Sequence, residues 1–172
     1  IMKKNKASID DMYNDLLNLG KIFKIEDKAN SIVKSYRNEL ASLTKDIQSK
    51  DPLKVFVYDS GEDTPFTAGL YAMPTALIEA AGGKNVMDNF RKSWGTVTWE
   101  EVIDRNPEVI VIVNYGNVTA EQKREFMMTN PAFTEIDAVK NDRFVTLEYV
   151  EATPGPRNIK AVKKLVKSFW KK

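Results

Sequence analysis

The 172-residue sequence contains neither cysteine nor histidine. Without cysteine, the chain has no disulfides, no thiolate zinc site and no cysteine nucleophile, and without histidine it lacks the most common metal ligand and general base. Serine-triad hydrolysis and histidine-based zinc catalysis are therefore excluded. We expect no metal site, no cofactor and no catalytic residue, and the chain is predicted not to be an enzyme.

Long apolar runs and a strong net charge are also missing. The longest apolar run, residues 109–113, has the length of a strand and falls far short of the roughly 20 residues that cross a bilayer. The 26 lysine and arginine residues nearly balance the 24 aspartate and glutamate residues. No nucleic-acid partner is expected from so small an excess of positive charge. Residues 1–4 lack the apolar core of an export signal, which we expect to have been removed or to lie upstream.

Residues 26–49 have the pattern of one long amphipathic helix. Apolar residues recur there at steps of three and four, with charged residues between them and no glycine or proline. Asp51-Pro52 is expected to end it. A shorter helix comes before it, with Ser8 as its N-cap and Gly20 at its end. The long helix is therefore predicted to precede a separate domain.

The remainder of the chain alternates strands with helices. Strands are predicted at residues 53–58, 85–87, 109–113 and 143–147, and helices at residues 69–81, 98–105, 119–128 and from residue 156 onward. The uninterrupted apolar run in the third strand suits a sheet covered on both faces. This order predicts an α/β fold, a three-layer Rossmann-like lobe with a mostly parallel sheet. Its ligand crevice is expected where the loops after the strands gather.

Four aromatic residues lie in or beside loops that border this predicted crevice: Phe66, Trp94, Tyr115 and Tyr149. A large, rigid ring on a loop supplies contact area at a low cost in entropy. Together the rings are predicted to line a cleft for a bulky planar or chelated ligand. The alternative is that each ring packs against its own loop.

Charged residues near the crevice give weaker signals. Asp59, Glu62 and Asp63 suit solvated turn formers better than a metal site or an acid–base pair. Arg157, next to Pro156 at the start of the last helix, is predicted to meet an anionic group of the ligand, and a capping or salt-bridge role fits it equally well.

The motifs PFTAG, EAAGGKNV, SWGTVTWEEVIDRNPEVIVI, YGN and PGPR follow the long helix in that order. In order and spacing they resemble the periplasmic binding proteins that serve ABC importers of ferric siderophores, haem and cobalamin. The resemblance implies two α/β lobes joined by one rigid helix, with the ligand between the lobes. This chain would hold a remnant of the first lobe (residues 1–25), the interlobe helix (26–50) and the C-terminal lobe (51–172). The first lobe itself would be missing from the chain.

The resemblance also implies a function and residue roles. The protein would act outside the cell membrane, in the periplasm or as a lipoprotein, and would deliver an iron-siderophore, haem or cobalamin-type ligand to an ABC permease. Phe66 and Trp94 match ligand-facing positions of cobalamin-binding relatives. Glu100 matches the acidic residue that docks on arginines of the permease, and compensation of the helix dipole is its alternative role. The lobe alone is expected to fold but to bind its solute weakly.

A different class of function competes with this interpretation. A cytosolic α/β enzyme or sensor could bind a nucleotide or a sugar in the same crevice, and a purely structural interaction module is a weaker third hypothesis. The sequence contains no GxGxxG motif and no P-loop lysine, so it gives no support for a phosphate site. A single-domain enzyme would also have no evident use for the long N-terminal helix.

Overall fold

The computed structural model describes residues 6–47 and 49–170. The predicted segments 1–25, 26–50 and 51–172 are therefore covered except for residues 1–5, 48 and 171–172, and the N-terminal residues 1–4 considered above lie outside the described ranges.

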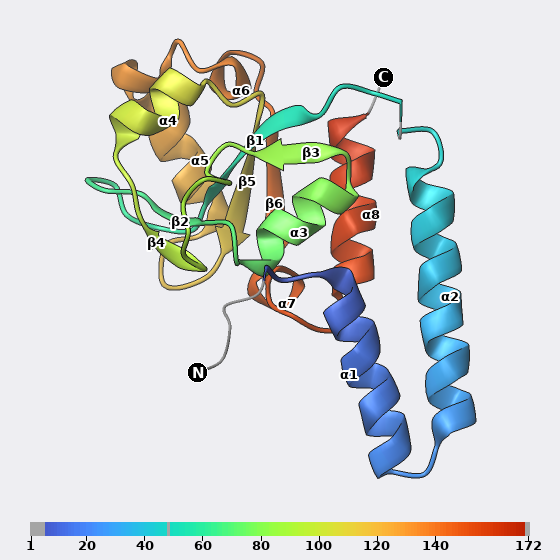
Figure 1. Cartoon of the computed structure of the whole chain (residues 1–172). Coiled ribbons are helices and arrows are strands. Elements are labelled where there is room, and N and C mark those ends of the chain that lie inside the picture. Colours follow the sequence, from blue (N-terminus) through green and yellow to red (C-terminus); the bar gives the residue numbers. More distant parts are fainter. Residues whose placement is uncertain (1–5, 48, 171–172) are drawn as a thin grey trace.

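A parallel sheet forms the centre of the α/β domain (Figure 1). Its strands, in spatial order, are β3 (Gly83–Asn85), β1 (Leu53–Tyr58), β5 (Val109–Asn114) and β6 (Phe144–Glu148). All three neighbouring pairs run parallel. The first five residues of β5 are buried, as expected for an apolar strand covered on both sides.

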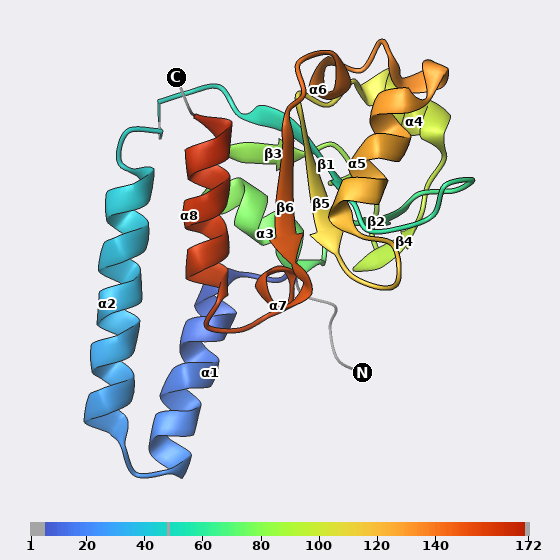
Figure 2. The same ribbon diagram turned by 180° about the vertical axis from the view of Figure 1, so that it is seen from behind.

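Helices cover both faces of this sheet, as Figures 1 and 2 show. One face carries α3 (Met73–Ala80), α7 (Tyr149–Ala152) and α8 (Asn158–Phe169). The other carries α4 (Trp99–Arg105), α5 (Ala120–Thr129) and α6 (Asp137–Lys140). Because side chains alternate along β1, Val55 and Val57 enter one core while Phe56 and Tyr58 enter the other. The predicted three-layer α/β fold is confirmed.

Two further helices, α1 (Ile9–Ile22) and α2 (Glu26–Thr44), form a hairpin that projects beyond the α/β domain (Figures 1 and 2). A small core of Met12, Tyr13, Val33 and Ile159 joins the hairpin to α8. Ser8 is the N-cap of α1, as the sequence predicted, and forms a capping box with Asp11; the predicted end at Gly20 was wrong, because the helix continues to Ile22.

The predicted long helix is shorter than expected. It ends at Thr44, and residues 45–47 form a turn, so Asp51-Pro52 does not end it. The apolar periodicity continues to Ile47, which is indeed buried. Its side chain lies close to Gly82 of the α/β domain. Ile47 is therefore buried by packing against this domain and not by a further turn of the helix.

The prediction of a helix from residue 69 was wrong for its first turn. The backbone N–H groups of Gly69 and Leu70 donate to the carbonyls of Ser93 and Phe90, at 2.8 and 2.9 Å. A side chain at Gly69 would collide with the carbonyl oxygens of residues 90 and 92, so this close approach requires glycine. Helix α3 starts only at Met73, with Pro74 in its first turn.

Other differences concern short elements. The sequence analysis missed a two-stranded antiparallel ribbon made of β2 (Phe66–Ala68) and β4 (Trp94–Thr96). It also missed α6 and α7, placed β3 two residues too late and started α8 two residues too early. Elements of three to five residues are too short for periodicity to reveal, and contacts with distant segments decide them.

Candidate functional site

Phe66 and Trp94 come from the two strands of the β2–β4 ribbon. Ala68 pairs with Trp94 and Phe66 pairs with Thr96, so the two rings are diagonal neighbours on one side of the ribbon. They stack with centroids 6.0 Å apart and an angle of 9° between the ring planes. The buried Asn85 side chain holds the ribbon in place, because its Nδ2 donates to the Ala68 carbonyl at 2.8 Å.

Tyr115 lies in the loop that follows β5, and Tyr149 is the first residue of α7, directly after β6. The strands are paired in register up to Asn114 and Glu148, so the next residue of each strand reaches the same point of the sheet edge. The two tyrosine rings stack with centroids 4.7 Å apart. Both rings remain about half exposed.

These four rings line one pocket of about 290 Å³ at the carboxyl edge of the sheet. The other residues that line it are Asp59, Val113, Ala152 and Thr153. The structure therefore brings together the four aromatic residues that the sequence analysis grouped. Carboxyl edges of parallel sheets are the usual place for ligands in this kind of fold, which makes the pocket the candidate site.

Asp59 is the charged residue of the pocket lining, and it is 8% exposed. Burial raises the pKa of its carboxyl group, while a hydrogen bond from the Ser60 hydroxyl and the positive charge of Lys123 act in the opposite direction. Burial also lowers the pKa of the Lys123 amine, and it raises the pKa of Tyr58 to about 12. Asp59 in the pocket lining, together with Tyr58 and Lys123 in the lining of a neighbouring cavity, therefore forms a group of poorly solvated polar side chains.

The sequence analysis missed Lys123, which is buried in α5. Its Nζ donates to the carbonyls of Val113 and Tyr115 at 2.7 and 3.0 Å. The available signal was its position, because Lys123 shares a helical face with the apolar residues Ala120 and Met127.

The two predicted charged contacts lie elsewhere. Arg157 is exposed at the N-cap of α8, outside the set of residues that line the aromatic pocket. Glu100 is exposed in the first turn of α4 and is also outside that set. The structure brings neither residue to the four rings.

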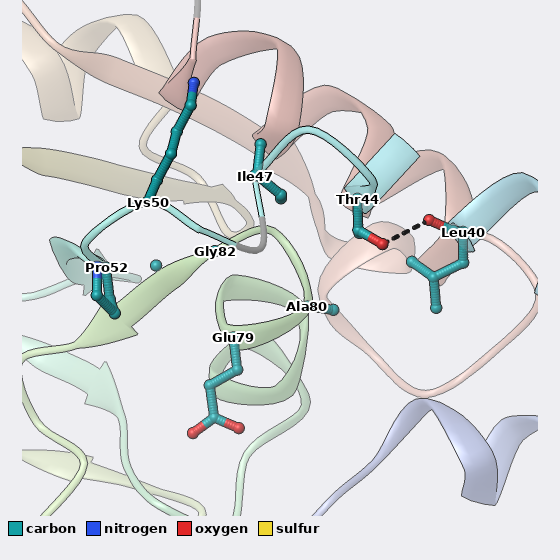
Figure 3. Close-up of a pocket in the computed structure, with 9 residues that line it drawn as sticks. Leu40, Thr44, Ile47, Lys50, Pro52, Glu79, Ala80 and Gly82 are labelled. Atoms are coloured by element: carbon teal, nitrogen blue, oxygen red, sulfur yellow. Dashed lines mark hydrogen bonds between the residues drawn. The ribbon is translucent and has the colours of Figure 1, made fainter. Parts of the chain in front are cut away.

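A larger cavity, of about 410 Å³, lies between α2 and α3 (Figure 3). Leu40, Thr44 and Ile47 line it from the α2 side, and Pro52 and Gly83 from the start of β1 and β3. It therefore opens near the amino ends of these strands, away from the edge where ligands bind in parallel sheets. Position and the gathering of aromatic rings favour the smaller aromatic pocket.

Comparison with known proteins identifies the family. The family model described as periplasmic binding protein matches residues 1–151. The chain belongs to the periplasmic binding protein family. The resemblance that the motifs suggested is thereby confirmed, and the three-layer α/β fold is the fold of its structural neighbours.

Individual members of the periplasmic binding protein family match most of the chain. The uncharacterized ABC transporter substrate-binding lipoprotein YvrC of Bacillus subtilis (strain 168) is 26% identical over 95% of this chain and 51% of its own length. The vitamin B12-binding protein of Salmonella choleraesuis (strain SC-B67) is 27% identical over 65% of this chain and 42% of its own length. The chain thus spans about half the length of these curated relatives.

A solved structure also matches nearly the whole chain over about half of its own length. A periplasmic binding protein from Veillonella parvula (DSM 2008) superposes with a TM-score of 0.87 and 34% identity, over 94% of this chain and 57% of that one. In the present chain, no helix within the described residues has the length and apolarity needed to cross a membrane. The same residues contain no group of three histidine, cysteine or acidic side chains arranged to hold a metal ion.

Proposed function

We propose that this chain is the interlobe helix and C-terminal lobe, with a remnant of the first lobe, of the solute-binding component of an ABC importer. It acts outside the cytoplasm, where it captures a bulky ligand and delivers it to the permease. The relatives are substrate-binding transport proteins and not enzymes, which disfavours the cytosolic nucleotide- or sugar-binding alternative.

The observation that carries the proposal is the pocket of two stacked aromatic pairs at the carboxyl edge of the sheet. Its volume of about 290 Å³ lies at the lower end of ligand sites, which usually bury most of the ligand surface. We infer that a first lobe supplies the opposite wall. Flat aromatic walls suit a large planar or chelated ligand.

The pocket lining favours some ligand classes over others. It contains four rings and the carboxyl group of Asp59, and no lysine or arginine is among the residues that line it. An anionic chelate would meet no cation in this lining, so a corrinoid or a neutral iron chelate fits this wall better than an anionic chelate or the propionate groups of haem. The vitamin B12-binding relative supports a corrinoid among these. Arg157, which is outside this lining, stays a predicted contact for an anionic group of the ligand.

Glu100 is proposed to dock on arginines of the permease. It is exposed at the start of α4, and a hydrogen bond connects this helix to the ligand side of the lobe. The Trp99 indole N–H donates to the carbonyl of Glu62, in the loop after β1, at 2.5 Å. A docking residue on such a helix is held rigidly relative to the pocket.

A titration tests the proposed function. The complete two-lobed protein and this chain alone are each titrated with cyanocobalamin, haemin and ferrichrome, and binding is followed by calorimetry. The complete protein is expected to bind one of these compounds at least ~100-fold more tightly than this chain does, because half a cleft buries only part of the ligand. Equal affinities would show that the ligand does not bind between lobes, and no binding of any probe by the complete protein would refute the proposed ligand classes.

A further inference from the structure

We propose that Lys123 is a positioning residue for the aromatic pocket: its buried ammonium group holds the loop after β5 so that Tyr115 stands against Tyr149 as one wall of the pocket. The ligand-binding part of this inference rests on the function proposed above. The structural part is independent of that function.

The contacts of Lys123 are made with the main chain. Its side chain leaves α5, is 2% exposed, and donates to the carbonyls of Val113 at 2.7 Å and Tyr115 at 3.0 Å. The first acceptor is inside β5, and the second is the residue whose ring forms the wall. One ammonium group thus ties the loop to the rigid end of the strand.

Burial of this charge needs a physical reason. An ammonium group loses much of its hydration when it is buried, and carbonyl dipoles together with the nearby charge of Asp59 compensate only in part. A methionine would fill a similar volume next to Ala120 and Met127 without that loss. What the amine adds is the fixed position of two carbonyl groups, which an apolar side chain cannot provide.

The wall needs such support because its rings are exposed. Tyr115 and Tyr149 are 55% and 49% exposed, so core packing does not fix them. Gly116 follows Tyr115 with a φ of 82°, and nothing lies within 4 Å of where its side chain would be. The loop is therefore open on its outer side, and the contact from Lys123 holds it from within.

The neighbouring loop has an anchor of the same kind. The buried carboxylate of Glu151 accepts hydrogen bonds from the Lys164 ammonium group at 2.6 Å and from the Glu148 N–H at 3.0 Å. This holds the start of α7, where Tyr149 lies. The stacked pair thus consists of two exposed rings, each on a segment that a buried charged side chain fixes.

Tyr115 also divides two cavities. It lines the aromatic pocket and a second cavity of about 230 Å³, whose lining includes Tyr58 and Lys123. Without its anchor, the Tyr115 ring would have free volume on both sides. We therefore expect loss of the Lys123 amine to change the shape of the pocket more than the stability of the fold.

The first experiment needs no ligand. Because the chain has no cysteine, Asn117→Cys places a single nitroxide label on the loop of this chain. Lys123→Met is expected to raise the mobility of this label in electron paramagnetic resonance spectra. The matched control Arg124→Met removes the neighbouring cation, which pairs with Asp142 on the surface, and should leave the spectrum unchanged.

The second experiment measures affinity for whichever of cyanocobalamin, haemin and ferrichrome the wild-type protein binds. Lys123→Met should weaken binding by ~10-fold and Arg124→Met by less than ~2-fold. In a protein that already carries Tyr115→Leu, Lys123→Met should weaken binding little further, because both changes act on the same wall. If Lys123→Met does not fold, Lys123→Gln replaces it in both experiments.

Unchanged label mobility, or unchanged affinity despite a mobile label, overturns the inference. If the wild type binds no probe, the proposed function fails, and the label still decides the structural part.

Discussion

The rings of Phe66 and Trp94 stack almost parallel, at 9° and 6.0 Å, although they belong to different strands. Each strand has only three residues, and their pairing places the two rings as diagonal neighbours. With the stacked tyrosines on the other side, the pocket has two flat aromatic surfaces that meet at one edge of the sheet. This arrangement leads to the first prediction.

Trp94→Leu in the complete protein should weaken ligand binding by up to ~10-fold, because an aromatic contact contributes about 0.5–1.5 kcal/mol beyond its buried area. It should also reduce the tryptophan quenching that the ligand causes, because Trp94 is the tryptophan in the pocket lining, while Trp99 and Trp170 are outside it. Fluorescence titration measures both effects. Phe144→Leu, at the opposite end of β6, is the control and should change neither. Unchanged affinity without the Trp94 ring would place the ligand elsewhere.

Glu100→Gln should lower uptake while leaving ligand affinity nearly unchanged, because the side chain is exposed on α4 and outside the pocket lining. The effect should shrink at high salt, as expected for an interaction between charges. Transport into vesicles at limiting binding protein measures it. Asp104→Asn removes another exposed charge from the same helix and serves as the control. Equal uptake by wild type and Glu100→Gln would argue against docking through this residue.

Asp59→Asn should stabilise the chain at neutral pH. Because the pKa of Asp59 is raised in the folded state, the folded protein binds its proton more tightly than the unfolded chain does. This contribution to stability is present at low pH and is lost as the pH rises from the unfolded pKa of 3.8 through the folded value. The melting temperature of Asp59→Asn should exceed that of wild type at pH 7 and match it near pH 3. A lower melting temperature at pH 7 would mean that the Asp59 charge stabilises the fold.

Glu151→Gln should have the opposite pH dependence. Burial by itself would raise the pKa of Glu151, but hydrogen bonds from Lys164 and from the Glu148 N–H outweigh it and lower the pKa. The stabilisation is therefore present above the unfolded pKa of 4.5 and is lost as the pH falls through the folded value.

Removing the Glu151 carboxylate should reduce the free energy of unfolding by about 2 kcal/mol at pH 7, because Glu151 is 3% exposed but the side chain of its partner Lys164 is 37% exposed and can be solvated. Urea unfolding at pH 7 and at pH 3 measures the loss and its decrease in acid. Glu39→Gln breaks the exposed pair with Lys163 and should cost less than about 1 kcal/mol. Similar losses for the two variants would show that burial of Glu151 does not matter.

The strong sequence patterns predicted the fold correctly for identifiable reasons. The run in β5 is apolar at successive positions because helices cover both sides of the sheet, and only a parallel, layered fold provides that cover. The four aromatic residues could be grouped because the sequence pattern places each in or beside a loop after a strand or before a helix, and the carboxyl ends of parallel strands share one edge. In the structure Phe66 and Trp94 lie within β2 and β4 instead. Their pairing into two stacks was not predictable, because it depends on strand register.

The sequence by itself determined the alternation of strands and helices, the burial of the central strand and the set of four aromatic residues, since local periodicity and turn residues encode these. Only the tertiary structure decided the β2–β4 ribbon, the end of α2 at Thr44 and the burial of Lys123. Each of these depends on partners far away in the chain, such as Asn85 for the ribbon, Gly82 for Ile47 and the β5 carbonyls for Lys123. Interactions between distant segments supply the free energy there, and local propensity is too weak to oppose them.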